Sequence, residues 1–375
     1  MTALSLGHVL QDRSLAVVAG TGGVGKTTVA AALGLAAGSA FDDGDVLVLT
    51  IDPARRLASA LGLPIDGNEV IELPMPKHVD TDARVFAAML DPSSAWDTMV
   101  RSEASDSQAA RILANPVYRR IADTFVHGND YAALGWLSGV VESGRYRLII
   151  VDTPPSQNAL DFFDAPQRVA DFFGSPLLSW LTGGDGSIMG SAAARTFSNM
   201  ADRLLGAEFF ADVVEFFGLM SEVVPGMVAR TGAVAAKLAS NDAAFVAVTT
   251  PAVDVLARLD CLAEQLASRD LAFDGVVVNS VEPDIFAENK VLDVSQRVVD
   301  NDSSPFSTAN TSLLTPGAEY VLERAQVARG QRLLLEQIPA EVVALLERVV
   351  DAPTSTVALF ALGQRLWGTT GDTLA

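Results

Sequence analysis

Short apolar runs and longer amphipathic stretches alternate along this chain. Apolar runs bounded by turn residues are typical of buried strands, and apolar positions three and four residues apart are typical of helices. The pattern predicts strands at residues 15–19, 45–51, 85–90, 148–151, 245–249 and 276–278. It predicts helices at residues 28–37 and 252–268, and mainly helical stretches over 96–143 and 157–240.

The last quarter of the chain is more mixed in character. Residues 282–316 are polar and rich in turn-forming residues, which indicates a mobile loop. A helix at 318–337, a short strand at 348–350 and a helix at 357–367 are expected to follow. Strands that alternate with helices favour a parallel sheet with right-handed crossovers. We therefore expect one α/β domain over residues 1–375, a doubly wound and mostly parallel sheet with an inserted helical subdomain at approximately 96–145 and 157–240.

A glycine-rich stretch lies between the first predicted strand and the first predicted helix. It reads Gly20-Thr21-Gly22-Gly23-Val24-Gly25-Lys26-Thr27 and fits the phosphate-binding loop pattern. Glycines let backbone N–H groups surround a triphosphate, and the helix N-terminus adds partial positive charge. Lys26 is then expected at the β- and γ-phosphates of ATP, and the Thr27 hydroxyl at Mg²⁺. The expected fold is therefore a sheet of the P-loop NTPase type.

Three polar residues follow predicted strands, at the edge of the sheet where ligands of such folds bind. Asp152 is in position to hold Mg²⁺, through water, and Asp52 to orient or deprotonate the attacking water. Either aspartate could instead cap a helix N-terminus. Asn279 is in position to pair with adenine through its amide, or is simply a turn residue.

Composition narrows the classes of partner. The formal net charge is −20, which argues against general binding to nucleic acid or anionic membrane. Cys261 is the only cysteine, so one chain cannot form a disulfide or a thiolate-based zinc or iron–sulfur site; we expect a core thiol. The N-terminal residues do not resemble a signal peptide, and no apolar stretch reaches the roughly 18 residues of a membrane span. A cytoplasmic protein is the default expectation.

Four segments together resemble one known family. They are residues 19–28, residues 50–54 (TIDPA), Asp91-Pro92-Ser93 and Asp152-Thr153-Pro154-Pro155. The chain is similar over roughly residues 13–280 to the ArsA family of P-loop ATPases, which includes the arsenical pump ATPase and the Get-pathway ATPase. The resemblance implies that Lys26, Thr27 and Thr28 contact phosphate and Mg²⁺, that Asp52 belongs to switch I, that residues 152–155 form switch II, and that Asn279 contacts adenine. It also implies a dimer that closes on ATP and opens on hydrolysis.

Two departures from the family pattern affect these expectations. The family's signature lysine, which reaches across the dimer, is replaced by Thr21. Arg55 or Arg56 could supply the missing cation, or are the solvated start of a helix; a related second subunit in a heterodimer is another source. The cysteines that bind metalloid or zinc in family members have no counterpart beyond Cys261.

The expected function is Mg²⁺-dependent ATP hydrolysis by a dimeric switch, coupled to a hydrophobic client or to a membrane transport partner. The alternatives are an ATP-gated binding module with slow hydrolysis, and a positioning ATPase similar to MinD or ParA. The acidic balance and the single cation of the last helix, Arg365, make this third class less favoured. An apolar helical stripe that includes Phe217 and Met220 is either core or a client groove.

Overall fold

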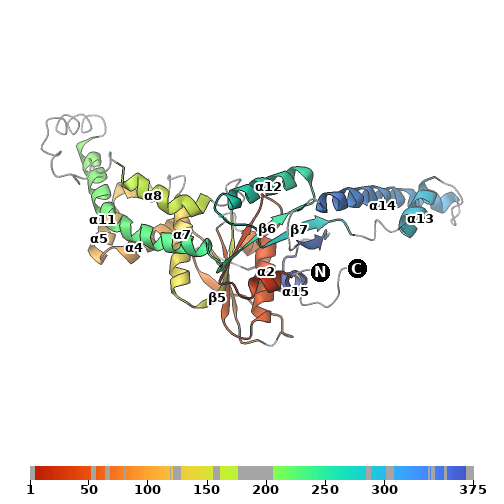
Figure 1. Ribbon diagram of the computed structural model, residues 1–375, viewed down its shortest axis with the longest axis horizontal. Helices are drawn as coiled ribbons and strands as arrows, with labels where there is room; N and C mark the ends of the chain where they lie inside the picture. The colour runs from red at the N-terminus through yellow and green to blue at the C-terminus, as the bar shows by residue number, and fades with distance from the viewer. Residues whose placement is uncertain are drawn as a thin grey trace.

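An eight-stranded sheet runs through the middle of the molecule (Figure 1). The computed structural model describes residues 5–51, 56–63, 68–79, 81–118, 120, 128–154, 161–175, 206–283, 289–300, 308–336, 338, 343–349 and 353–368. The strands are β1 (Leu15–Ala19), β2 (Asp45–Thr50), β3 (Val70–Glu72), β4 (Val85–Met89), β5 (Tyr146–Asp152), β6 (Ala243–Thr249), β7 (Gly275–Val281) and β8 (Val343–Glu347). Their order is β3-β4-β2-β5-β1-β6-β7-β8, and only the β3–β4 pair is antiparallel. The predicted doubly wound, mostly parallel sheet is confirmed.

Helices cover both faces of this sheet. The helices are α1 (Leu6–Leu10), α2 (Lys26–Ala40), α3 (Arg56–Leu61), α4 (Pro92–Glu103), α5 (Asp106–Ala114), α7 (Gly128–Glu142), α8 (Ala165–Phe173), α11 (Ala207–Leu238), α12 (Val253–Ala267), α13 (Asn289–Val299), α14 (Thr308–Leu335) and α15 (Thr356–Trp367). A short 3₁₀ helix, η1 (Asp161–Asp164), precedes α8.

Alternate residues of the central strands point to opposite faces, so each face has its own core. Ala16 and Val18 of β1 pack in a cluster with α1, α2, α3 and α15. Leu15, Val17 and Ala19 of the same strand pack in a second cluster with α4, α7 and α11. Because β1 is buried on both faces, its sequence is continuously apolar and does not alternate.

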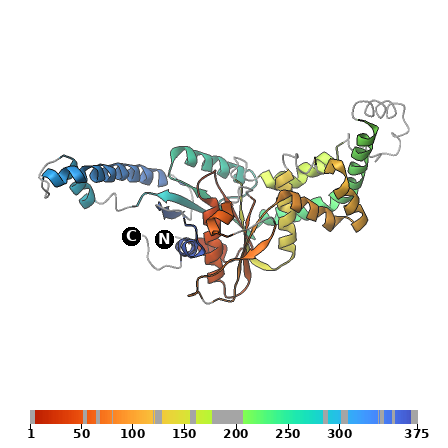
Figure 2. The same cartoon turned by 180° about the vertical axis from the view of Figure 1, so that it is seen from behind.

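The helices α4, α5, α7, α8 and α11 extend beyond the sheet at one end of the molecule (Figures 1 and 2). Helix α11 changes direction along its length in Figure 1 and contains Pro225, which cannot donate a backbone hydrogen bond. Phe217 and Met220, in the half before Pro225, are 8% and 2% exposed and belong to the core cluster. The core interpretation of the apolar stripe therefore holds at these two positions.

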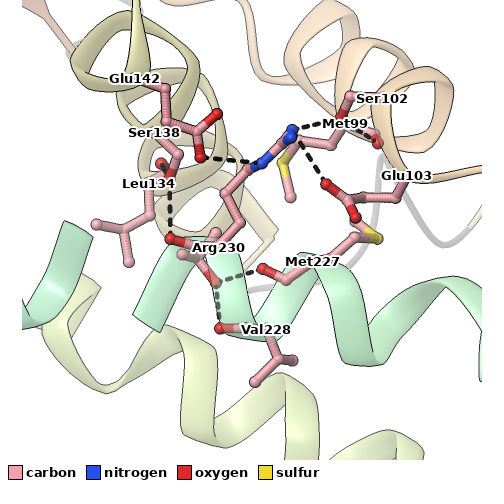
Figure 3. A network of polar contacts seen from close by, with 10 residues as sticks. Met99, Ser102, Glu103, Leu134, Ser138, Glu142, Met227, Val228 and Arg230 are labelled. Atoms are coloured by element: carbon pink, nitrogen blue, oxygen red, sulfur yellow. Dashed lines mark hydrogen bonds and ion pairs between the residues drawn. The ribbon is translucent and has the colours of Figure 1, made fainter. Parts of the chain in front are cut away.

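One turn after Pro225, an arginine joins three of these helices (Figure 3). The guanidinium of Arg230 forms ion pairs with Glu103 of α4 at 3.0 Å and with Glu142 of α7 at 3.2 Å. It also donates to the Ser102 hydroxyl at 2.9 Å. Charged hydrogen bonds therefore supplement apolar packing at this junction.

At the opposite end, α13 and α14 lie side by side and reach away from the sheet (Figures 1 and 2). The prediction of a loop over residues 282–316 is wrong for the part that these two helices occupy. Helix α13 has apolar side chains at helical spacing, with Val298 buried, and its exposed face carries the Arg297–Asp293 ion pair. Pro316 lies inside α14 and does not mark its start.

A buried carboxylate links helix α14 to the end of the sheet. Glu282, directly after β7, is 5% exposed. Its carboxylate accepts from Arg324 of α14 at 3.0 Å and from Arg348, just after β8, at 3.1 Å. The strand predicted at 348–350 is misplaced, because the strand that pairs with β7 is Val343–Glu347.

Candidate functional site

The glycine-rich loop joins the carboxyl end of β1 to the start of α2. Its backbone is left-handed at Gly25, with a φ of 96°. A Cβ atom at Gly25 would lie 2.4 Å from the amide nitrogen of Asn279. Gly25 is also the N-cap of α2 and offers no side-chain cap, so the first N–H groups of the helix remain available to an anion. The loop therefore has the conformation and the helix terminus that phosphate binding requires.

Lys26 holds its ammonium group against the beginning of the loop. The side chain is 5% exposed, and Nζ donates to the carbonyl oxygens of Gly20 at 2.9 Å and Thr21 at 3.1 Å. A buried ammonium requires such partners or an anion, because an uncompensated charge is costly away from water. The cation is thus positioned within the loop, as the motif predicts.

Asp152 connects the loop to two strands. Its side chain is fully buried, and Oδ2 accepts from the Thr27 hydroxyl at 2.7 Å and from the Thr50 hydroxyl at 2.9 Å. The structure therefore brings together residues that are distant in sequence and lie at the start of α2 and the carboxyl ends of β2 and β5. A hydroxyl and a carboxylate side by side are the oxygen ligands that Mg²⁺ prefers, so this donor set fits the ion.

The carboxyl end of β5 is anchored to the central strand. Thr153 donates to the Val18 carbonyl oxygen through its backbone N–H at 3.2 Å and through its hydroxyl at 2.9 Å. Pro155, Asp52 and Arg55 lie outside the described residues. Arg56 begins α3, and its side chain is likewise not described. The roles expected of Asp52, Arg55 and Arg56 therefore remain predictions.

Asn279 approaches the phosphate loop from β7. Its amide nitrogen donates to the Val24 carbonyl oxygen at 2.9 Å, and its amide oxygen accepts from the backbone N–H of Ser280 at 2.9 Å. Ser280 adopts a left-handed φ of 62°, which is uncommon for a residue other than glycine. The contact with adenine remains a prediction, while the contact with the loop is a feature that sequence reasoning missed.

A cavity of about 220 Å³ lies on the other side of the loop's first residues. It is bordered by Gly20 and Thr21, by Thr249 at the end of β6, and by Arg258 and Cys261 of α12. Cys261 is exposed, so the expectation of a core thiol is wrong; the buried face of α12 is formed by Leu259, Leu262 and Leu266. No motif marks Arg258, and only the fold brings it to the same cavity as Thr21.

The described part of the chain lacks a metal-binding cluster and a membrane-spanning helix. It contains no cluster of three or more histidine, cysteine, aspartate or glutamate residues that could hold a metal ion. None of the helices in the described ranges combines the length and the apolar character needed to cross a bilayer.

The sheet is mostly parallel, and a glycine-rich loop joins β1 to α2. The loop holds Lys26, and Asp152 from the neighbouring strand β5 accepts from the loop's Thr27. These features define a P-loop NTPase. The family model of the anion-transporting ATPases matches residues 14–303. The chain belongs to this family.

Curated relatives agree with this assignment. The chain is 26% identical over 164 residues to the ATPase GET3 of Malassezia globosa, covering 43% of this chain and 46% of that protein. It is 27% identical over 223 residues to the ATPase GET3 of Rhodotorula glutinis, covering 58% and 59%. The chain thus spans about half the length of the curated relatives it matches.

Proposed function

We propose that this protein is a Mg²⁺-dependent ATPase. The observation that carries the proposal is the buried carboxylate of Asp152 bonded to the phosphate-loop hydroxyl of Thr27 at 2.7 Å. This contact supports the proposal because a carboxylate and a hydroxyl, the oxygen ligands that Mg²⁺ prefers, meet at the residue that follows Lys26 in the loop. The family and the printed names of the relatives, which are ATPases, support the same activity.

Each residue of the site has a distinct role in this proposal. Backbone N–H groups of residues 20–25 surround the phosphates, and the Lys26 ammonium leaves the Gly20 and Thr21 carbonyls for the β- and γ-phosphates. The Thr27 hydroxyl and the Asp152 carboxylate would hold Mg²⁺ through their oxygen atoms. Bound Mg²⁺ supplies charge neutralisation on the phosphate oxygens. Asp52 orients the attacking water and accepts its proton.

The proposed working unit is a dimer that closes when ATP binds and opens after ATP is hydrolysed. This part rests on the resemblance to the family. A homodimer and a heterodimer with a related ATPase are distinguished by light scattering of the purified chain with and without ATP. The client or membrane partner of such a switch belongs to the same proposal and is to be identified by what co-purifies from the native host.

Assays of phosphate release and of nucleotide binding test the proposed ATPase activity. Lys26→Ala should abolish ATP binding, because phosphate charge in the loop would be uncompensated. Asp52→Asn should bind ATP and fail to hydrolyse it, since an amide cannot accept the proton of water. Lys237→Ala, which removes an equally rare lysine from the end of α11, is the matched control and should behave as the wild type. Hydrolysis by Asp52→Asn at the wild-type rate would show that Asp52 has another role.

A further inference from the structure

The cavity beside the phosphate loop is bordered by both loop and helix residues. On one side are Gly20 and Thr21, the first two residues of the loop, and on the other is α12 with Arg258. Figure 1 shows α12 packed alongside β6, whose carboxyl end lies at the same edge of the sheet as the loop. A sphere with this cavity's volume of about 220 Å³ is about 7.5 Å across, a distance that a long, flexible arginine side chain can span.

The phosphate-loop motif indicates which end of a nucleotide would face this cavity. The Lys26 ammonium lies 2.9 Å from the Gly20 carbonyl and 3.1 Å from the Thr21 carbonyl. In phosphate loops this lysine contacts the β- and γ-phosphates. In the proposed function, the distal phosphates of ATP would therefore lie close to Gly20 and Thr21, which both border the cavity.

Arg258 is available for a ligand. It is exposed and forms no ion pair with any carboxylate of the described residues, including Asp254, four positions before it on α12. Several other arginines in the described ranges form ion pairs, among them Arg13 with Asp274, Arg230 with Glu103 and Arg269 with Asp164. Others in these ranges, such as Arg365, form none, and Arg258 differs from these because it borders the cavity at Thr21. In a chain with a net charge of −20, an arginine without such a pair at the edge of a largely apolar cavity is suited to bind an anion.

We propose that Arg258 reaches across this cavity to the terminal phosphate of ATP and makes the site prefer ATP to ADP. The inference rests on the proposed function and adds a specificity-determining residue to that site. Thr21 contributes no charge at the loop, so the guanidinium of Arg258 supplies the second cation beside Lys26. Because ADP lacks the terminal phosphate, the contact of Arg258 is lost when ADP is bound.

Calorimetric binding of a non-hydrolysable ATP analogue and of ADP, both with Mg²⁺, tests this inference. Arg258→Ala should weaken binding of the ATP analogue by about tenfold or more, the usual effect of losing a hydrogen bond between charged groups. Binding of ADP should change by less than about twofold. Arg258→Lys, which keeps the charge, should retain most of the preference. The control is Arg365→Ala, an exposed arginine of α15, which should leave both affinities unchanged.

The single cysteine provides a second measurement that does not depend on hydrolysis. Cys261 is exposed, borders the same cavity and lies one helical turn from Arg258. The rate at which a neutral disulfide reagent modifies this thiol should fall several-fold more with the ATP analogue than with ADP. In Arg258→Ala that difference should disappear. Far-ultraviolet circular dichroism and thermal unfolding establish that this variant is folded.

The outcomes separate this inference from the proposed function. Wild-type protein that binds neither nucleotide overturns both. If the wild type binds ATP and Arg258→Ala keeps the same ratio of ATP to ADP affinity, the role of Arg258 is overturned and the proposed function is not. Equal rates of Cys261 modification with the ATP analogue and with ADP in the wild type also overturn it, because the terminal phosphate would then not affect the cavity.

Discussion

Replacing Arg230 by alanine should loosen the junction of three helices without touching the phosphate loop. Arg230 lies on α11 just after Pro225, and its guanidinium joins α4 and α7 through Glu103 and Glu142 (Figure 3). A proline interrupts the hydrogen bonds of α11 here, so the helix depends on neighbours to hold its direction. The alanine variant removes both ion pairs and the bond to Ser102 at once.

The expected loss follows from the exposure of each partner. The Glu142 side chain is 52% exposed, and an ion pair of that kind contributes about 0–1 kcal/mol. The Glu103 side chain is 17% exposed, and a hydrogen bond to a charged group in such surroundings contributes about 1.5–3 kcal/mol. We therefore expect Arg230→Ala to lower the free energy of unfolding by about 1.5–4 kcal/mol.

Urea unfolding followed by tryptophan fluorescence measures this loss, because Trp96 of α4 and Trp136 of α7 lie in the helices concerned. The matched control is Arg111→Ala. It removes the Arg111–Glu215 pair, which also involves α11 but whose side chains are 59% and 42% exposed, so the loss should stay below about 1 kcal/mol. A double-mutant cycle of Arg230→Ala with Glu103→Gln should give a coupling energy of about 1–2 kcal/mol. Equal losses in the two arginine variants would refute this reasoning.

Three further predictions concern the core, the phosphate loop and pH. Phe217→Ser with Met220→Ser should destabilise the protein by more than about 4 kcal/mol in urea unfolding, since both side chains are buried; a stable double variant would favour a client groove instead. Asn279→Ala should weaken ATP and GTP binding equally, because the amide supports the loop at Val24, and a loss for ATP alone would indicate the adenine contact. Burial raises the pKa of Tyr131 to about 12, so the unfolded chain ionises first and stability falls between pH 10 and pH 12. At pH 11 the wild type should lose about 1.4 kcal/mol more, relative to pH 8, than Tyr131→Phe; equal losses would contradict this origin.

Much of the site was predictable because it is built from local patterns at strand ends. The glycine loop requires a strand before it and a helix after it, and β1 and α2 begin and end as the apolar pattern predicts within a few residues. Asp152 follows a short apolar run, and in a parallel sheet the carboxyl ends of strands share one edge. That rule alone brings Asp152 near the loop, and in the structure its carboxylate accepts from the Thr27 hydroxyl at 2.7 Å. Its role toward Mg²⁺ stays a prediction.

Elements at the margins of the sheet were harder to predict. The edge strand β3 has only three residues, Val70–Glu72, too few to show a period. The turn-forming residues around α13 predict a loop there, although the apolar positions of this helix have helical spacing. The prediction of a core thiol at Cys261 is wrong because the sheet beneath α12 determines which side of this amphipathic helix is buried, and Cys261 is exposed.

The two arginines on which the tests above depend show the limit of sequence reasoning most clearly. Arg258 and Arg230 both follow apolar helical stretches, and nothing in their immediate sequence distinguishes them. The fold gives Arg230 two carboxylates from helices that precede it by about ninety residues or more, and gives Arg258 a cavity bordered by Thr21. Partners so distant in sequence are set by how helices cross the sheet, which local propensity does not encode. An arginine that is paired with carboxylates of neighbouring helices, such as Arg230, stabilises the fold. An arginine that borders a cavity, such as Arg258, remains available to a ligand. Only the structure distinguishes these two cases.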